Sequence, residues 1–302
     1  MIYDILVIGG GPAGLTAATY ARRAGKSVLV IEKNAFGGQI TWSPRVENFP
    51  GFVSVTGTEL GDKLLEQAME QGAEVELEEV VSVRAEADGT RTAVCESGAE
   101  FRGRALIAAV GARPRMLGVE REEELVGSGV CYCAVCDGAF FAGQDVAVCG
   151  GGNAALQDAL LLSETCRRVT LIHRRADFRG EQRLVEALKE KENVDLVMSA
   201  RVTALLGDGE LTGVTVVQDG EERTLPVTGL FVAVGHQPDH GVFSELLALD
   251  EAGYAASGED CMTKSAGVFV AGDCRKKGVR QLTTAVADGA VAALAACRYL
   301  DA

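Results

Sequence analysis

The chain has 302 residues, of which 47% are hydrophobic and 24% are charged, a composition that excludes disordered and fibrous proteins and allows one large or two ordinary domains. The net charge of −14 disfavours general nucleic-acid binding, because an acidic surface repels phosphate backbones. Any phosphate recognition is therefore local, and the 37 glycines point to loops where the backbone closely approaches a ligand.

Membrane insertion and export are not expected. No apolar run approaches the roughly 18 residues that span a bilayer. The first basic residue is Arg22, so no basic leader precedes the first predicted strand. The nine cysteines are odd in number and too few for a disulfide scaffold. These features predict a cytoplasmic protein.

Residues 4–33 have the pattern of a strand, a glycine loop, a helix and a second strand. Gly9, Gly11 and Gly14 allow a tight turn, close approach to a pyrophosphate and close helix–strand packing, with the helix N-terminus facing the anion. Glu32 ends the second strand, where it can accept hydrogen bonds from an adenosine ribose. The pattern predicts a dinucleotide site; the alternative is a purely structural turn.

Residues 145–175 repeat this unit. Their glycine loop contains Gly150, Gly152, Asn153 and Ala155, and the predicted helix continues to residue 163 before a strand over residues 168–172. Because the glycines of this copy are intact, we predict a second dinucleotide site. The alternative is a duplicated copy that has lost its function.

The two copies differ at the end of the second strand. His173 follows Gly150 at the same distance as Glu32 follows Gly9. The loss of the acid, together with donors at His173, Arg174, Arg175 and Arg179, predicts a site for a 2′-phosphate and a preference for NADPH over NADH. The alternative is a solvated basic patch.

The copies also end alike, each with a buried strand, a glycine and a proline, over residues 106–114 and 230–238. A further strand over residues 267–273 and a small-residue helix over 283–300 follow only the second copy. The simplest topology inserts residues 114–245 into a first domain made of residues 1–113 and 246–302. We therefore predict an α/β fold with two Rossmann-like, three-layer nucleotide-binding domains, the second inserted in the first.

Cys133 and Cys136 form a CxxC motif between the two glycine-loop units. Thiols at this spacing can close a small disulfide and perform redox chemistry. Zinc would need four ligands, and no second CxxC or His pair is present, so no metal site is predicted. Buried inert thiols are the other alternative. Asp137 either exchanges a proton with the second thiol or caps a helix.

Seven segments in order resemble bacterial-type thioredoxin reductases, which belong to the pyridine nucleotide-disulfide oxidoreductases: residues 9–14, 37–39, 46–51, 133–138, 150–153, 173–179 and 267–273. The resemblance covers residues 3–301. It implies a homodimeric flavoprotein whose FAD domain is interrupted by an NADPH domain carrying the redox cysteines, and that domain rotates during turnover. It also implies FAD contacts at Glu32, Gly38, Gln39, Asn48, Val83, Asp273, Arg280 and Gln281.

The same resemblance implies the reaction. NADPH passes a hydride to the flavin, the reduced flavin opens a Cys133–Cys136 disulfide, and the dithiol reduces the disulfide of thioredoxin or a thioredoxin-like protein. Cys136 would face the flavin, Cys133 would attack the partner, and Asp137 would shuttle protons.

Several positions depart from the family pattern. Ala139 takes the first place of the usual aromatic pair, so Phe140 and Phe141 are shifted, and Ser128 replaces a basic residue. A usual Glu is Gln157. Cys131 is an additional thiol, either a packed bystander or a source of alternative disulfides. The runner-up functions are a ferredoxin-dependent reductase, a reductase of another disulfide, a flavin redox sensor and a peroxide-producing oxidase.

Overall fold

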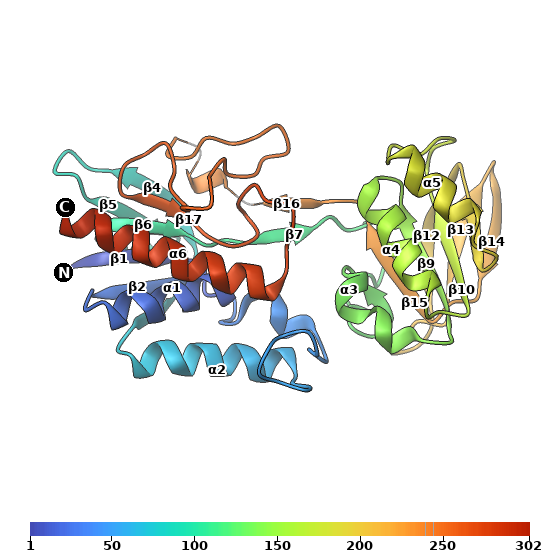
Figure 1. Ribbon diagram of the computed structural model, residues 1–302, viewed down its shortest axis with the longest axis horizontal. Coiled ribbons are helices and arrows are strands. Elements are labelled where there is room, and N and C mark those ends of the chain that lie inside the picture. Colours follow the sequence, from blue (N-terminus) through green and yellow to red (C-terminus); the bar gives the residue numbers. More distant parts are fainter. Residues whose placement is uncertain (239, 244) are drawn as a thin grey trace. The chain divides into compact units, whose positions relative to one another are not determined.

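The computed structural model describes residues 1–238, 240–243 and 245–302. The chain divides into two compact units, unit 1 with Met1–Arg113 and Gln237–Ala302, and unit 2 with Pro114–His236 (Figure 1). The strands β7 (Ala112–Pro114) and β16 (His236–Pro238), at the two points where the chain passes between units, pair in a two-stranded sheet.

The second boundary lies before Gln237 and not after residue 245, where the sequence analysis placed it. The physical reason is hydrophobic burial. Phe243, Leu246 and Leu247 are buried in a cluster with strand residues of unit 1, such as Leu6 and Leu106. The short helix η3 (Gly241–Phe243) therefore packs on unit 1 through Phe243, and Leu246 and Leu247 extend the same contact.

Unit 1 is built on a seven-stranded sheet in the order β3-β2-β1-β6-β5-β4, with β17 also paired to β6. Residues of β1 alternate between two cores: Ile5 and Val7 enter one buried cluster, and Leu6 and Ile8 enter the other. The sheet is therefore covered on both faces. Its strands are β1 (Ile2–Ile8), β2 (Val28–Glu32), β3 (Glu74–Leu77), β4 (Val80–Ala85), β5 (Arg91–Cys95), β6 (Glu100–Ala108) and β17 (Val268–Val270).

The helices α1 (Pro12–Arg23) and α6 (Leu282–Asp301) lie side by side on one face of this sheet, and α2 (Gly57–Glu70) packs against α1 (Figure 1). The contact between α1 and α6 is close because Gly289 has no side chain. A Cβ atom at this position would lie 2.2 Å from the carbonyl oxygen of Ala13. Small residues therefore set the distance between the two helices.

Unit 2 has a five-stranded parallel sheet in the order β11-β10-β9-β15-β8. One face is covered by α3 (Ala134–Asp137), η2 (Gly138–Phe141), α4 (Asn153–Ser163) and α5 (Gln182–Lys189), and the other by an antiparallel sheet of β12 (Ala200–Leu206), β13 (Gly213–Gln218) and β14 (Glu221–Leu225). The parallel strands are β8 (Val130–Cys131), β9 (Asp145–Gly150), β10 (Arg168–Ile172), β11 (Val194–Val197) and β15 (Gly229–Ala233).

The two units repeat one topology. The orders β3-β2-β1-β6 and β11-β10-β9-β15 correspond strand by strand, and a glycine loop follows the central strand in each, β1 and β9. The predicted α/β class with two Rossmann-like domains is confirmed. Within the described ranges, no helix has both the length and the apolar character needed to cross a membrane.

We expect Gly289→Ala to lower the free energy of unfolding by about 1–3 kcal/mol, because the added methyl group forces α6 away from α1. Gly278→Ala is the control, since a Cβ atom there has nothing within 4 Å. Thermal unfolding followed by circular dichroism measures both. Equal unfolding temperatures for the two variants would contradict the role given to the helix contact.

Candidate active site

The glycines of the first loop have separate tasks. A Cβ atom at Gly9 would lie 2.4 Å from the Ala109 carbonyl oxygen, and one at Gly14 would lie 1.9 Å from the Gly9 carbonyl oxygen. These two glycines are therefore required by the fold. A Cβ atom at Gly11 meets only the Cα atom of Gly38, at 3.9 Å. Gly11 thus leaves space in front of the start of α1, where a ligand's phosphate can approach the backbone.

Glu32 lies at the end of β2 and closes the side of this loop. Its Oε2 accepts a hydrogen bond from the Gly10 amide at 2.7 Å, and its Oε1 accepts one from the Asn34 amide at 2.9 Å. The carboxylate is thereby held beside the glycine loop, as the ribose-binding prediction requires.

The remaining residues with an implied FAD contact lie in four parts of unit 1. Gly38 begins η1 (Gly38–Trp42) opposite Gly11, and the adjacent Gln39 donates its side-chain amide to the Ala112 carbonyl at 3.1 Å. Val83 lies on β4 and packs against the sheet face opposite α1. Its contact with a cofactor stays a prediction.

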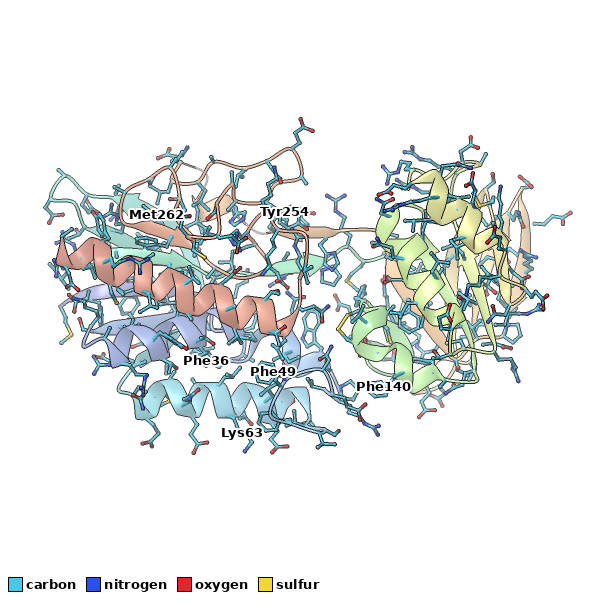
Figure 2. All side chains as sticks on the ribbon, viewed as in Figure 1. Phe36, Phe49, Lys63, Phe140, Tyr254 and Met262 are labelled. Atoms are coloured by element: carbon cyan, nitrogen blue, oxygen red, sulfur yellow. A yellow bond between two sulfur atoms is a disulfide. The ribbon has the colours of Figure 1, made fainter. Side chains whose placement is uncertain are left out.

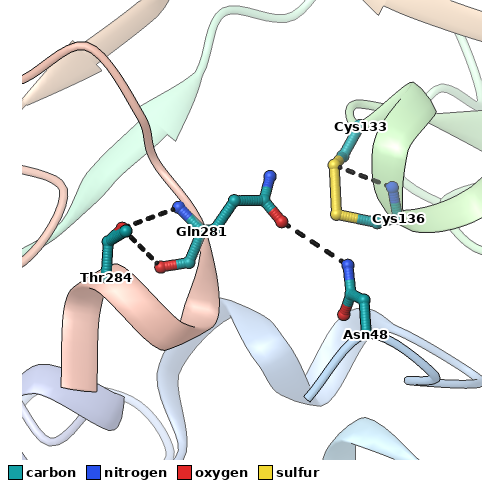
Figure 3. The surroundings of a disulfide bond; sticks show 5 residues. All are labelled: Asn48, Cys133, Cys136, Gln281 and Thr284. Atoms are coloured by element: carbon teal, nitrogen blue, oxygen red, sulfur yellow. Dashed lines mark hydrogen bonds between the residues drawn. A yellow bond between two sulfur atoms is a disulfide. The ribbon is translucent and has the colours of Figure 1, made fainter. Parts of the chain in front are cut away.

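Asn48 and Gln281 are joined by a hydrogen bond from Nδ2 to Oε1 at 3.4 Å, and the Gln281 amide, at the start of α6, donates to the Thr284 hydroxyl at 3.1 Å (Figure 3). Arg280 donates to the carbonyl oxygen of Asp273 at 3.1 Å. Its guanidinium lies 3.8 Å from the ring centroid of Tyr254, which Figure 2 marks. The loop before α6 therefore brings Asp273, Arg280 and Gln281 together.

The second loop uses its glycines in the same way as the first. A Cβ atom at Gly150 would lie 2.5 Å from the Ala233 carbonyl oxygen and 2.6 Å from the Cβ atom of Ala155, whereas one at Gly152 would meet nothing within 4 Å. Asn153 then fastens the start of α4 to Glu181 through two reciprocal hydrogen bonds, of 2.7 and 3.0 Å. The open position is again the middle glycine of the motif.

His173 is buried, unlike the exposed arginines Arg174, Arg175 and Arg179. A Cβ atom at Gly151 would lie 2.2 Å from its ring, which stacks on Phe178 at 5.4 Å between centroids. Burial lowers the pKa of His173, so the ring is neutral at pH 7. His173 supports the loop from beneath, and its contact with a phosphate stays a prediction.

Cys133 and Cys136 are joined by a disulfide, with their Cα atoms 5.2 Å apart (Figure 3). The Sγ of Cys133 also accepts a hydrogen bond from the Cys136 amide at 3.2 Å. Of the nine cysteines, the other seven are buried and unpaired. No group of three or more metal-ligating side chains occurs in the part of the chain that the structure describes, which gives the zinc alternative no support.

Asp137 ends α3, next to the disulfide. Burial raises its pKa to about 6, although a hydrogen bond with Cys131 acts in the opposite direction. Burial also raises the pKa of the Cys131 thiol, which stays protonated at pH 7. Cys131 is therefore a packed thiol on β8, and Asp137 titrates in the range where it can give or take a proton.

Sequence reasoning missed Glu122, which is buried in unit 2. Its carboxylate accepts hydrogen bonds from the amides of Leu117 and Gly118, at 2.9 and 2.8 Å, and from the hydroxyl of Tyr132 at 3.0 Å. Tyr132 lies between Cys131 and Cys133, so Glu122 anchors the redox loop. It occurs in a run of three glutamates, and no sequence signal distinguishes it from its neighbours.

Comparison with known proteins agrees with this geometry. The sequence model of the pyridine nucleotide-disulphide oxidoreductase family matches residues 3–289. The thioredoxin reductase of Listeria monocytogenes is 41% identical over 99% of this chain and 94% of its own, and a bifunctional thioredoxin reductase/thioredoxin of Mycobacterium leprae is 42% identical over 99% of this chain and 66% of its own. The crystal structure of the Streptococcus pyogenes thioredoxin reductase is 36% identical, with a TM-score of 0.93 over 99% of this chain and 98% of its own.

The chain belongs to the pyridine nucleotide-disulphide oxidoreductase family. It is an oxidoreductase, and its cofactors are FAD and NADPH. The two loops fit such cofactors, because the open positions at Gly11 and Gly152 admit a pyrophosphate to the backbone.

In the wild type, we expect the rate at which the reduced Cys133 and Cys136 thiols are alkylated to change with pH near 6, and we expect Asp137→Asn to abolish this change. The same variant should slow disulfide turnover about 10- to 100-fold. The raised pKa means that the folded state favours the neutral acid, so its contribution to stability is full below the unfolded pKa of about 3.9 and is lost as pH rises through 6. Asp137→Asn should remove this dependence as well.

Asp158→Asn is the matched control, because burial also raises the pKa of Asp158 to about 6. This variant should change the pH dependence of stability and leave the alkylation profile of the thiols as in the wild type. An unchanged alkylation profile in Asp137→Asn would contradict the proton-exchange role.

Proposed function

We propose that the chain is an NADPH-dependent flavoprotein that reduces the disulfide of thioredoxin or a thioredoxin-like protein. The observation that carries this proposal is the Cys133–Cys136 disulfide beside a carboxyl group with a pKa of about 6, in the unit that also holds the second glycine loop. The Mycobacterium leprae relative, by its name, combines a thioredoxin reductase with a thioredoxin in one chain, which supports thioredoxin as the partner.

Unit 1 is assigned to FAD and unit 2 to NADPH. The Glu32 carboxylate beside the first loop suits an unphosphorylated ribose, whereas Arg174, Arg175 and Arg179 beside the second suit a 2′-phosphate. The remaining FAD contacts in this proposal are the residues named above: Gly38, Gln39, Asn48, Val83, Asp273, Arg280 and Gln281.

Bound FAD supplies two-electron transfer between the nicotinamide and the disulfide. Two electrons and two protons convert the Cys133–Cys136 disulfide to two thiols, with Asp137 exchanging one proton. The Cys133 thiolate then attacks a sulfur of the partner disulfide, breaking it and forming a mixed disulfide. Cys136 attacks the Cys133 sulfur of that bond, which releases the reduced partner and restores the intramolecular disulfide.

The proposal also includes a homodimer and a cytoplasmic location. The seven buried, unpaired cysteines support the location, since thiols persist in reducing compartments. Of the shifted aromatic pair that follows Ala139, Phe141 is packed edge-on against Phe231, with 5.4 Å between centroids. Val135, within the CxxC motif, is 60% exposed and is the apolar side chain nearest the disulfide in sequence that a partner can contact.

We expect Cys133→Ser to abolish thioredoxin reduction while NADPH still bleaches the flavin absorbance under anaerobic conditions, since this thiol acts only after the flavin is reduced. Cys131→Ser is the control and should keep both activities, because Cys131 is outside the disulfide. A flavin that stays oxidised with NADPH in the wild type would refute the proposal. Reduction by ferredoxin alone would favour the ferredoxin-dependent alternative.

We expect the double variant Arg174→Ala, Arg175→Ala to raise the KM for NADPH at least about tenfold and to leave the KM for NADH unchanged, since each charge-assisted hydrogen bond contributes about 1.5–3 kcal/mol. Arg168→Ala is the control in the same unit; its partner is Asp195, at 3.0 Å. Steady-state kinetics with both nucleotides measure the effect. A parallel rise of both KM values would contradict phosphate recognition by these arginines.

A further inference from the structure

Unit 1 contains a buried charge cluster, which we define as Arg275, Lys277 and Asp288. Their side chains are 4%, 7% and 10% exposed, respectively. Burying ions costs several kcal/mol each, and apolar side chains of similar size often stabilise a fold as well or better. Stability of unit 1 alone therefore does not explain why charged residues occupy these positions. The contacts of the cluster indicate a further role.

Asp288, on α6, holds both ends of the loop that follows β17. Its Oδ2 accepts hydrogen bonds from the Gly272 amide at 3.1 Å and from Nζ of Lys277 at 3.0 Å. Arg275 binds the same carboxylate through Nη2 at 2.8 Å and Nε at 3.2 Å. Burial alone would raise the pKa of Asp288, but the hydrogen bonds from Arg275 and Lys277 outweigh it and lower the pKa, so the carboxylate is ionised at pH 7.

Lys277 connects this buried carboxylate to a second one. Its Nζ also lies 3.4 Å from Oδ1 of Asp273, whose side chain is 34% exposed. Asp273 follows β17 and is one of the proposed FAD contacts. Arg280, another of them, donates to the backbone carbonyls of Asp273 and Arg275, at 3.1 and 3.4 Å. The charge cluster therefore fastens the loop from beneath, on the side away from solvent.

We propose that Lys277 is a positioning residue for FAD: its ammonium group bridges Asp288 and Asp273 and holds the Asp273 carboxylate ready for the cofactor. This inference rests on the proposed function, which assigns FAD to unit 1. A loop that is fixed before binding loses less conformational entropy when the ligand binds, and the smaller loss of entropy increases the affinity. In this proposal the directed hydrogen bonds of the buried charges fix the geometry of the loop.

The test uses Lys277→Met, which keeps an unbranched side chain one atom shorter than that of lysine and removes its charge. FAD is removed from the full-length protein, and its rebinding is followed by quenching of flavin fluorescence. We expect the Kd for FAD to rise at least about tenfold, and Lys277→Arg to restore most of the affinity, because a charged donor again reaches both carboxylates. The matched control is Lys276→Met, at the neighbouring exposed lysine, which should bind FAD within about twofold of the wild type.

A double-mutant cycle separates positioning from general stability. If Lys277 acts through Asp273, the losses of FAD affinity in Lys277→Met and Asp273→Asn will not add in the double variant, whereas independent effects will add. Additive losses, or an unchanged Kd in Lys277→Met, overturn the inference. Should circular dichroism show that Lys277→Met is unfolded, Lys277→Gln takes its place in the cycle, since its amide removes the charge and keeps a donor.

The outcome for the wild type distinguishes this inference from the function on which it rests. A wild-type apoprotein that does not bind FAD refutes the proposed function itself. A wild type that binds FAD, with a Lys277→Met variant that binds equally well, refutes only the positioning role.

Discussion

Close contact between backbones is the constraint on which both units depend. In unit 1, a Cβ atom on Gly14 would lie 1.9 Å from the carbonyl oxygen of Gly9, and one on Gly289 would lie 2.2 Å from that of Ala13. In unit 2, the corresponding distance at Gly150 is 2.5 Å. Only glycine permits these contacts. Those at Gly14 and Gly150 bring the start of a helix against the end of the central strand, and the one at Gly289 brings α6 against α1. The anion-binding end of the helix and the open middle glycine follow from that approach.

One position then gives the two loops different chemistry. Glu32 ends β2 and His173 directly follows β10, the equivalent strand of unit 2. Both contact the glycine loop, Glu32 through the Gly10 amide and His173 through its ring beneath Gly151. Both side chains therefore support a glycine loop, but they differ in charge. A carboxylate stands beside the first loop, whereas a neutral ring and exposed arginines stand beside the second. An acidic chain thereby keeps a local group of exposed arginines beside its second glycine loop.

Much of the repeated unit could be predicted because its signals are local. The second-copy strand over residues 168–172 and the end of its helix at residue 163 agree with β10 and α4. The end of the inserted unit was placed too late, because no motif lies between Pro238 and residue 267 to mark the boundary, whereas the burial of Phe243 assigns that segment to unit 1. The antiparallel strands β12–β14, which cover one face of the second sheet, were also not predicted, since they lie between the motifs.

Some features of the candidate site could be predicted from the sequence, and others depend on the fold. The glycine spacing, the CxxC motif and the change from an acid to a basic segment identify the chemistry from sequence, because they are properties of short stretches of chain. Burial of Glu122, the position of His173 beneath Gly151 and the contacts among Arg275, Lys277 and Asp288 depend on which side chains the fold brings together. Desolvation and the distance between charges determine whether an acid is a surface residue or an anchor. Only the tertiary structure sets those two quantities, and sequence alone determines which residues carry the charges.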